Sequence, residues 1–227
     1  TTWPSRERKK TDSSEGNGRD REKDDGARTS NGDALKRRYS IREDDEGGRF
    51  LTCAEAPNVS VRMERGLAVS AAAAKRAPSG TIYLDGAAAS APFMDVQKRV
   101  YNLDHHQDCV RSFTLATCEQ AMVLVFKGLD LQSGEWTVWA NEPDLDTVLA
   151  IWILLNHRRL MSEDSEILKE IMPLVRLEGL IDANGLKAVE LSGFPKDLEK
   201  RTMELIERLR EIELEVKKSG KWGSADF

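Results

Sequence analysis

The chain has 227 residues, of which 32% are charged and 40% are hydrophobic, and its formal net charge is −5. The negative charge argues against a general surface for nucleic acids or anionic membranes. No apolar run approaches the roughly 20 residues that a membrane-spanning helix needs. Three scattered cysteines without a CxxC spacing indicate reduced thiols. We therefore expect a soluble, cytoplasmic protein.

The N-terminal third of the chain is expected to contribute little to the fold. Residues 1–49 are rich in charged residues, Ser and Gly and poor in apolar residues, which is typical of a disordered tail. The mixed charges of residues 19–25 favour a solvated tail over a nucleic-acid-binding arm. Residues 50–80 are interpreted as a linker or poorly ordered segment, in which residues 71–74 form either a short helix or part of the linker.

The compact part is predicted to span residues 81–194. Short β-prone runs alternate there with helical patterns. This alternation predicts an α/β fold with a mostly parallel, doubly wound sheet and flanking helices. The expected strands are 81–84, 99–103 and 136–140, and the expected helices are 95–98, 117–129 and 148–155.

The C-terminal part is predicted to be helical. Residues 165–178 read as a helix interrupted by Pro173, and residues 179–185 read as a turn that carries Asp182. The last segment, 195–227, is interpreted as an amphipathic helix over about 195–218 followed by a tail. Packing on its own domain is the favoured role of this helix, and a homodimer or another partner bound through it is the alternative. Its apolar stripe consists of Leu198, Leu205, Leu209, Ile212 and Val216.

Acidic residues and histidines follow the predicted strands. Asp85 follows the first strand, Asp104-His105-His106 follows the second, and Asp144 follows the third. Ligands of open α/β sheets bind beyond the carboxyl ends of the strands, so these side chains are expected to meet there. Carboxylates mixed with imidazole suit Mn²⁺ or Mg²⁺. The pattern therefore predicts a divalent-metal site.

Four pieces of the chain carry a resemblance to one family: residues 84–86 (LDG), 103–106 (LDHH), 112–120 (SFTLATCEQ) and 141–146 (NEPDLD). Together they resemble the DHH phosphoesterase superfamily. That superfamily includes RecJ-type exonucleases, oligoribonucleases, cyclic-dinucleotide phosphodiesterases and family II inorganic pyrophosphatases. The resemblance covers roughly residues 81–185.

The resemblance implies a phosphohydrolase that uses two divalent ions, usually Mn²⁺, and a metal-activated water. Its substrate would be a phosphodiester or phosphoanhydride of a nucleotide, in a small molecule or short oligonucleotide. His106 would face the phosphate, and Asp85 would bridge the two ions. The implied metal ligands are Asp85, Asp104, His105, Asp144, Asp146 and, as a further acid, Asp182.

Two roles are argued from the residues themselves. Arg111 lies just past the triplet, where its guanidinium can pair with a phosphate oxygen. An ordinary surface arginine is the alternative. Asp104 can orient a histidine instead of binding metal directly.

The sequence also departs from the family pattern. The acids Asp144 and Asp146 normally precede the triplet and here follow it, which indicates a permuted order or a fragment. Ala140 stands where the family has a histidine, and Thr147 stands where it has a glycine or another small residue. No second, closing domain is recognised. These departures favour an alternative function, a catalytically degenerate relative that binds a nucleotide or a protein partner.

Overall fold

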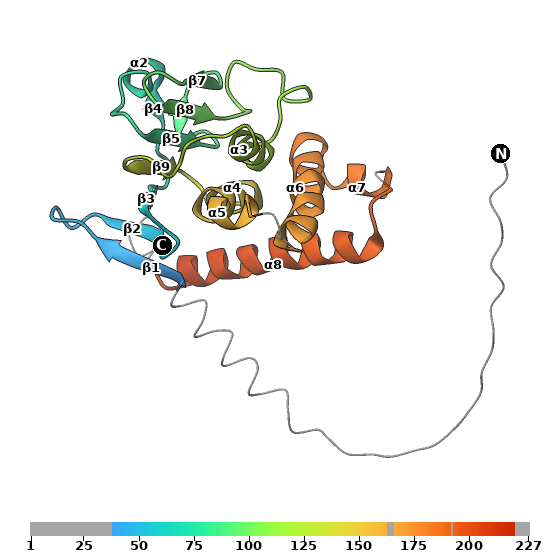
Figure 1. The fold of residues 1–227 in the computed structure, drawn as a ribbon. Coiled ribbons are helices and arrows are strands. Elements are labelled where there is room, and N and C mark those ends of the chain that lie inside the picture. Colours follow the sequence, from blue (N-terminus) through green and yellow to red (C-terminus); the bar gives the residue numbers. More distant parts are fainter. Residues whose placement is uncertain (1–37, 163–165, 192, 221–227) are drawn as a thin grey trace, which may run out of the picture. The chain divides into compact units, whose positions relative to one another are not determined.

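The computed structural model describes residues 38–162, 166–191 and 193–220 (Figure 1). The strands are β1 Tyr39–Glu43, β2 Arg49–Cys53, β3 Ala56–Met63, β4 Val69–Ser70, β5 Thr81–Leu84, β6 Ala88–Ala89, β7 Phe93–Asp95, β8 Val100–Leu103 and β9 Trp136–Ala140. The helices are α2 Ala71–Ala74, α3 Thr117–Phe126, α4 Leu145–Leu155, α5 His157–Leu160, α6 Glu166–Asn184, α7 Lys187–Leu191 and α8 Lys196–Lys218.

Seven strands form one mixed sheet in the order β1-β2-β3-β9-β5-β8-β7. The four central strands, β3, β9, β5 and β8, are parallel. Strand β2 pairs antiparallel with β3, β7 pairs antiparallel with β8, and β1 pairs antiparallel with β2. Every residue of β5 and β8 is buried. Both faces of these strands are covered, which explains why they read as continuous apolar runs. The α/β class and the three predicted strands are confirmed.

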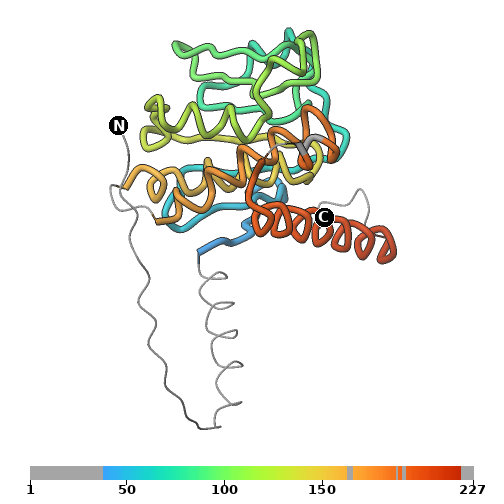
Figure 2. Tube along the Cα trace, turned by 90° about the vertical axis from the view of Figure 1, so that its right-hand side faces the viewer, coloured from blue at the N-terminus to red at the C-terminus, as the bar shows by residue number. Residues whose placement is uncertain are grey.

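The two faces of the sheet are covered differently. Helices α3 and α4 pack on one face in a core with Ile82, Leu103 and Val138 (Figures 1 and 2). The opposite face, around Tyr83 and Val100, is covered by the short helix α2 and by the β4–β6 pair. The doubly wound arrangement is therefore not confirmed.

The predicted disorder up to residue 49 and the predicted linker over 50–80 are wrong for the described residues. Strands β1, β2 and β3 lie there and extend the same sheet, so the fold begins before residue 81. Val59 and Val61 are buried and alternate with more exposed residues, a strand signal that the surrounding charged residues obscured. Residues 1–37 lie outside the described residues.

Two helix predictions need correction. Residues 93–95 form strand β7, paired with β8, in place of a helix at 95–98. Asp95 Oδ1 accepts the Lys98 backbone N–H at 2.9 Å and so favours a turn. Helix α6 continues through Pro173 as far as Asn184, so Asp182 lies on a helix and not in a turn. Proline removes one backbone donor, and burial of the α6 side chains Val175 and Leu177 favours a continuous helix despite that loss.

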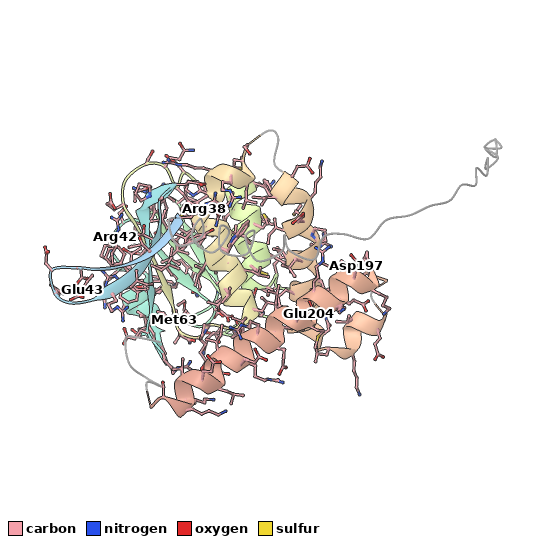
Figure 3. The ribbon with its side chains drawn as sticks, turned by 90° about the horizontal axis from the view of Figure 1, so that it is seen from below. Arg38, Arg42, Glu43, Met63, Asp197 and Glu204 are labelled. Atoms are coloured by element: carbon pink, nitrogen blue, oxygen red, sulfur yellow. The ribbon has the colours of Figure 1, made fainter. Side chains whose placement is uncertain are left out.

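Helix α8 matches the predicted C-terminal helix and packs on its own chain. Ile206 and Leu209 contact the main core, while Asp197 and Glu204 are exposed (Figure 3). Met203 and Leu214 are also partly exposed. The tail beyond residue 220 lies outside the described residues. None of the described helices is long and apolar enough to cross a membrane.

Candidate metal centre

The predicted site residues converge at the carboxyl ends of the parallel strands. Asp85 follows β5, and the Asp104-His105-His106 triplet follows its parallel neighbour β8. Asp85 lies in the left-handed region, with φ of 45°, and Gly86 has φ of 78°. The Ala87 N–H donates to Leu84 O at 3.0 Å and closes a tight turn. An aspartate tolerates this conformation better than most residues, and the turn holds its carboxylate in the site.

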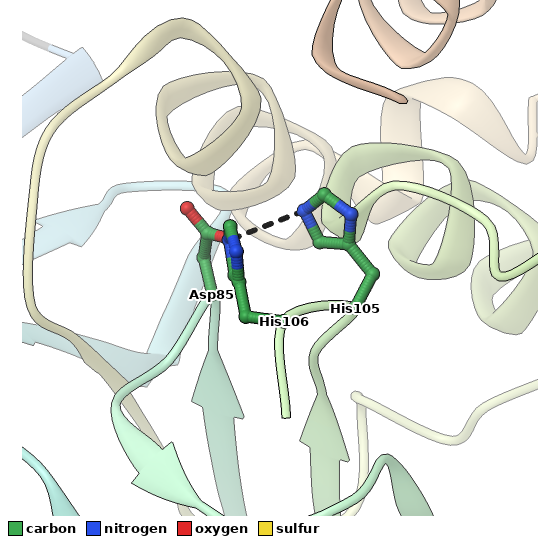
Figure 4. Close-up of side chains that lie close together, drawn as sticks. All are labelled: Asp85, His105 and His106. Atoms are coloured by element: carbon green, nitrogen blue, oxygen red, sulfur yellow. Dashed lines mark hydrogen bonds and ion pairs between the residues drawn. The ribbon is translucent and has the colours of Figure 1, made fainter. Parts of the chain in front are cut away.

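Asp85 is the centre of a hydrogen-bond network. Figure 4 shows Asp85 beside the rings of His105 and His106. Asp85 Oδ1 lies 2.7 Å from His106 Nε2, and Asp85 Oδ2 accepts the Thr147 hydroxyl at 3.0 Å. The Thr117 hydroxyl lies 3.4 Å from Oδ1. Burial alone would raise the pKa of Asp85, but the close contact with His105 and the hydrogen bond with His106 outweigh it and hold the pKa well below its usual range. The carboxylate is therefore ionised at neutral pH.

His105 faces several carboxylates at once. Its Nε2 lies 3.3 Å from Asp85 Oδ1, 3.4 Å from Asp146 Oδ2 and 3.1 Å from Asp182 Oδ2. The side chain is 1% exposed, and neither ring nitrogen makes a hydrogen bond of acceptable geometry. Burial opposes protonation, but hydrogen-bonding and charge effects of Asp146, Asp85 and Asp182 raise the pKa of His105 to about 10. Without an ion, a positive imidazolium is therefore favoured at this place.

Asp146 connects the site to helix α3. Its two oxygens accept the backbone N–H groups of Thr117 at 2.9 Å and Cys118 at 2.7 Å. These are the first residues of α3, whose N–H groups have no partner within the helix. Asp146 is 1% exposed. The same carboxylate thus anchors a helix N-terminus and faces His105.

Helix α6 brings two further acids to the site. Asp182 and Glu178 lie four residues apart, on one face of the helix. Gly179 permits this approach, because a Cβ there would overlap the carboxylate of Glu119 on α3. Glu178 is buried, and its Oε2 has no hydrogen-bond partner. Burial and the charges of Asp146, Asp144 and Asp182 raise the pKa of Glu178 to about 8.

Asp144 and Asp104 occupy different positions from those expected of ligands. Asp144 caps α4, with the Thr147 N–H at 2.9 Å from its Oδ1. Its side chain is exposed in part, but desolvation by the crowded surroundings and the charge of Asp85 raise its pKa to about 7. Asp104 is fully buried, and its Oδ1 accepts the backbone N–H groups of His105 at 2.7 Å and His106 at 3.0 Å. Asp104 therefore shapes the turn that presents both rings.

Arg111 pairs within the protein. Its guanidinium donates to both oxygens of Asp182, at 2.8 and 3.0 Å, and its side chain is 44% exposed. The expected pairing with a phosphate would have to share or replace this contact. His106, in contrast, is 40% exposed at the edge of the site. Its hydrogen bond with Asp85 raises its pKa above the ordinary value of 6.5.

Among the residues that the structure describes, two groups of side chains have ligand atoms close enough to hold an ion. They are Asp85 with His105 and His106, and His105 with Asp146 and Asp182. Atoms bound at about 2.1 Å from one ion stand roughly 3.0–3.4 Å apart in octahedral or tetrahedral geometry. The separations around His105 Nε2 match this range. A buried nitrogen without a hydrogen bond, facing an excess of carboxylates, fits a divalent cation.

Glu178, Thr117 and Thr147 were not predicted as site residues. The four-residue spacing of Glu178 and Asp182 was a usable signal, but the turn expected at 179–185 concealed it. The two threonines gave no comparable signal, because their roles depend on contacts with Asp85 across the fold.

No family model, curated protein or solved structure matches the chain. The chemistry of the site is therefore argued from its residues and their geometry.

Proposed function

We propose that this protein is a divalent-metal-dependent phosphoesterase that hydrolyses a phosphodiester or phosphoanhydride, with a nucleotide or oligonucleotide as the expected substrate. The observation that carries the proposal is His105 Nε2, buried without a hydrogen bond and 3.1–3.4 Å from three carboxylate oxygens. The motifs that resemble DHH phosphoesterases supply the same residues and support the same chemistry.

One ion is best supported by His105, Asp85, Asp146 and Asp182. An imidazole nitrogen has one lone pair, so His105 Nε2 can hold only one ion. A second ion, as the resemblance implies, would need His106, Asp85 and Asp144. Asp144 belongs to neither ion-sized group among the described residues, which weakens that second position. Mn²⁺ or Mg²⁺ suits these ligands, and such an ion neutralises phosphate oxygens and lowers the pKa of water.

The chain's own residues supply further parts of the reaction. His106 is half exposed beside Asp85, and this carboxylate favours its protonated form. A cationic His106 also carries a proton on Nδ1, and this N–H can bind a phosphate oxygen or pass its proton to the leaving oxygen. Asp104 fixes the backbone of both histidines through its hydrogen bonds, and Thr147 orients Asp85. Preorganised groups of this kind favour the charge distribution of phosphoryl transfer.

The function is tested by titrating Mn²⁺ into metal-free protein by calorimetry and by assaying hydrolysis of pyrophosphate, short RNA, short DNA and cyclic dinucleotides. We expect saturable Mn²⁺ binding and Mn²⁺-dependent hydrolysis of at least one substrate. Asp85→Ala should abolish hydrolysis while the circular dichroism spectrum is unchanged. Asp197→Ala is the matched control, since Asp197 lies on α8 with a side chain 74% exposed. Full activity of Asp85→Ala would contradict the proposed role.

A second candidate function is a degenerate relative that binds a nucleotide or a protein partner without hydrolysis. Ala140, at the end of β9, is fully buried in the core and supplies no ligand where the family has a histidine. Asp144 also lies outside both ion-sized groups among the described residues. The same assays separate the two functions. Mn²⁺ binding without hydrolysis of any substrate favours the binder.

A further inference from the structure

A groove of about 470 Å³ lies beside the metal centre. Its walls come from the loop before α4, the C-terminal half of α6 and the middle of α8. Helix α8 crosses next to α6 in both ribbon views (Figures 1 and 3). The volume is within the range of pockets that bind small organic molecules, roughly 300–1,000 Å³.

One end of the groove belongs to the metal centre. Asp144, Glu178 and Asp182 line it, and Asp182 Oδ2 is the atom that lies 3.1 Å from His105 Nε2. A molecule in the groove therefore borders the position proposed for the ion. The negative charges at this end repel a free anion, so an anionic group is accommodated only next to a cation.

The remainder of the groove is largely aliphatic. Ile206, Leu209 and Ile212 of α8 line it together with Ile181 of α6. Ile212 is 41% exposed, so its apolar surface is accessible to a ligand. Burying an apolar group against such side chains is favourable in proportion to the area removed from water. An ion with only phosphate groups, such as pyrophosphate, gains nothing from this surface.

We infer that this groove holds the apolar substituent of the substrate, and that the substrate class is an organic phosphate ester and not inorganic pyrophosphate. The inference rests on the proposed function, because the phosphate must be held at the metal centre. Helix α8 then forms one wall of the substrate site. Among the described residues there is no second domain that could form this wall instead. Arg65 and Arg210 also line the groove and can contact polar atoms of the same substituent.

The test compares two anions that share one head group and are not hydrolysed, phenylphosphonate and methylphosphonate. Each is titrated by calorimetry into the full chain with saturating Mn²⁺. We expect phenylphosphonate to bind about tenfold tighter, as apolar burial predicts. Ile212→Asn should remove most of that preference and leave methylphosphonate affinity unchanged. Leu214→Asn is the matched control, since Leu214 is 47% exposed on the same helix and does not line the groove.

Each outcome is decisive. Equal affinity for the two anions overturns the groove inference and leaves the metal-dependent function standing. A preference that survives Ile212→Asn, or that Leu214→Asn removes equally, places the phenyl group elsewhere and also overturns the inference. If neither anion binds and Mn²⁺ itself does not bind, the proposed function fails and the inference fails with it.

Discussion

The two ends of the parallel strands differ in how far their polar groups are hydrogen-bonded. At the amino ends, Gly80 and Arg99 are tied by backbone pairs: the Gly80 N–H donates to Arg99 O, and the Thr137 N–H donates to Gly80 O. At the carboxyl ends, like-charged carboxylates surround His105, whose ring nitrogens lack hydrogen bonds. Both ends contain left-handed residues, Arg99 at 57° and Asp85 at 45°. The polar groups at the amino end are paired with each other, whereas the groups at the carboxyl end fit the divalent cation proposed above.

The largest expected effect is at the amino end. A Cβ on Gly80 would overlap the backbone carbonyl of Glu135, and Gly80 has φ of +84°. Gly80→Ala should therefore lower the free energy of unfolding by about 3–5 kcal/mol. Gly66→Ala is the control, because Gly66 has φ of +76° but nothing within 4 Å of its added Cβ. It should cost about 1–2 kcal/mol, the penalty of the left-handed conformation alone. Urea unfolding measures both, and equal losses would show that the close contact contributes nothing.

The next effect concerns the carboxyl end. Mn²⁺ at a hundredfold excess over its dissociation constant should stabilise the protein by about 2.7 kcal/mol. Asp182→Asn should abolish most of this gain. In metal-free protein the same substitution should change stability by less than about 1 kcal/mol, because it weakens the half-exposed Arg111 pair and the contact with His105 but also relieves the repulsion between Asp182 and Glu178. Thermal unfolding with and without Mn²⁺ gives both values. A large metal-free loss with an unchanged Mn²⁺ gain would assign Asp182 to stability alone.

A smaller effect tests how α6 reaches the site. Gly179→Ala should cost about 1–3 kcal/mol, since the new methyl group meets the Glu119 carboxylate. In the Glu119→Ala background the same change should become neutral or stabilising by up to about 1 kcal/mol, because alanine favours a helix more than glycine does. A double-mutant cycle by urea unfolding measures the difference. Additive effects would locate the strain outside this contact.

The smallest effect comes from a buried histidine away from both ends. Burial lowers the pKa of His157 below its ordinary value of 6.5, and its Nε2 has no partner, while Nδ1 lies 2.8 Å from Leu154 O. Below pH 6.5 the unfolded chain binds more protons at this position, so stability is complete above that pH and falls on acidification. His157→Gln should reduce the slope of stability between pH 6.5 and 5. An identical slope in the variant would attribute the loss to other groups.

The central strands were predictable because β5, β8 and β9 are short apolar runs that end in turn or acidic residues. The strands before residue 81 were not recognised, because charged residues are interleaved with the apolar ones in β1 and β2, and because β3 pairs with β9 far away in sequence. The meeting of Asp85 with the triplet followed from parallel strand order alone. Which acids face the proposed ion and which only support the backbone could not be predicted. Asp104 accepts backbone N–H groups, whereas Asp146 both accepts backbone N–H groups and faces His105. This difference depends on side-chain directions, which the spacing of residues in the sequence does not reveal.

The hydrogen bonds between Asp146 and the first residues of α3 make ion binding observable at backbone amides. The amide protons of Thr117 and Cys118 end on the carboxylate that faces His105, so their exchange with solvent deuterium reports locally on what occupies the centre. The proposed cation would draw electron density from the Asp146 oxygens, weaken these two hydrogen bonds and so speed the exchange. Amide exchange at the start of α3, measured by nuclear magnetic resonance, therefore reports on ion binding without any substrate.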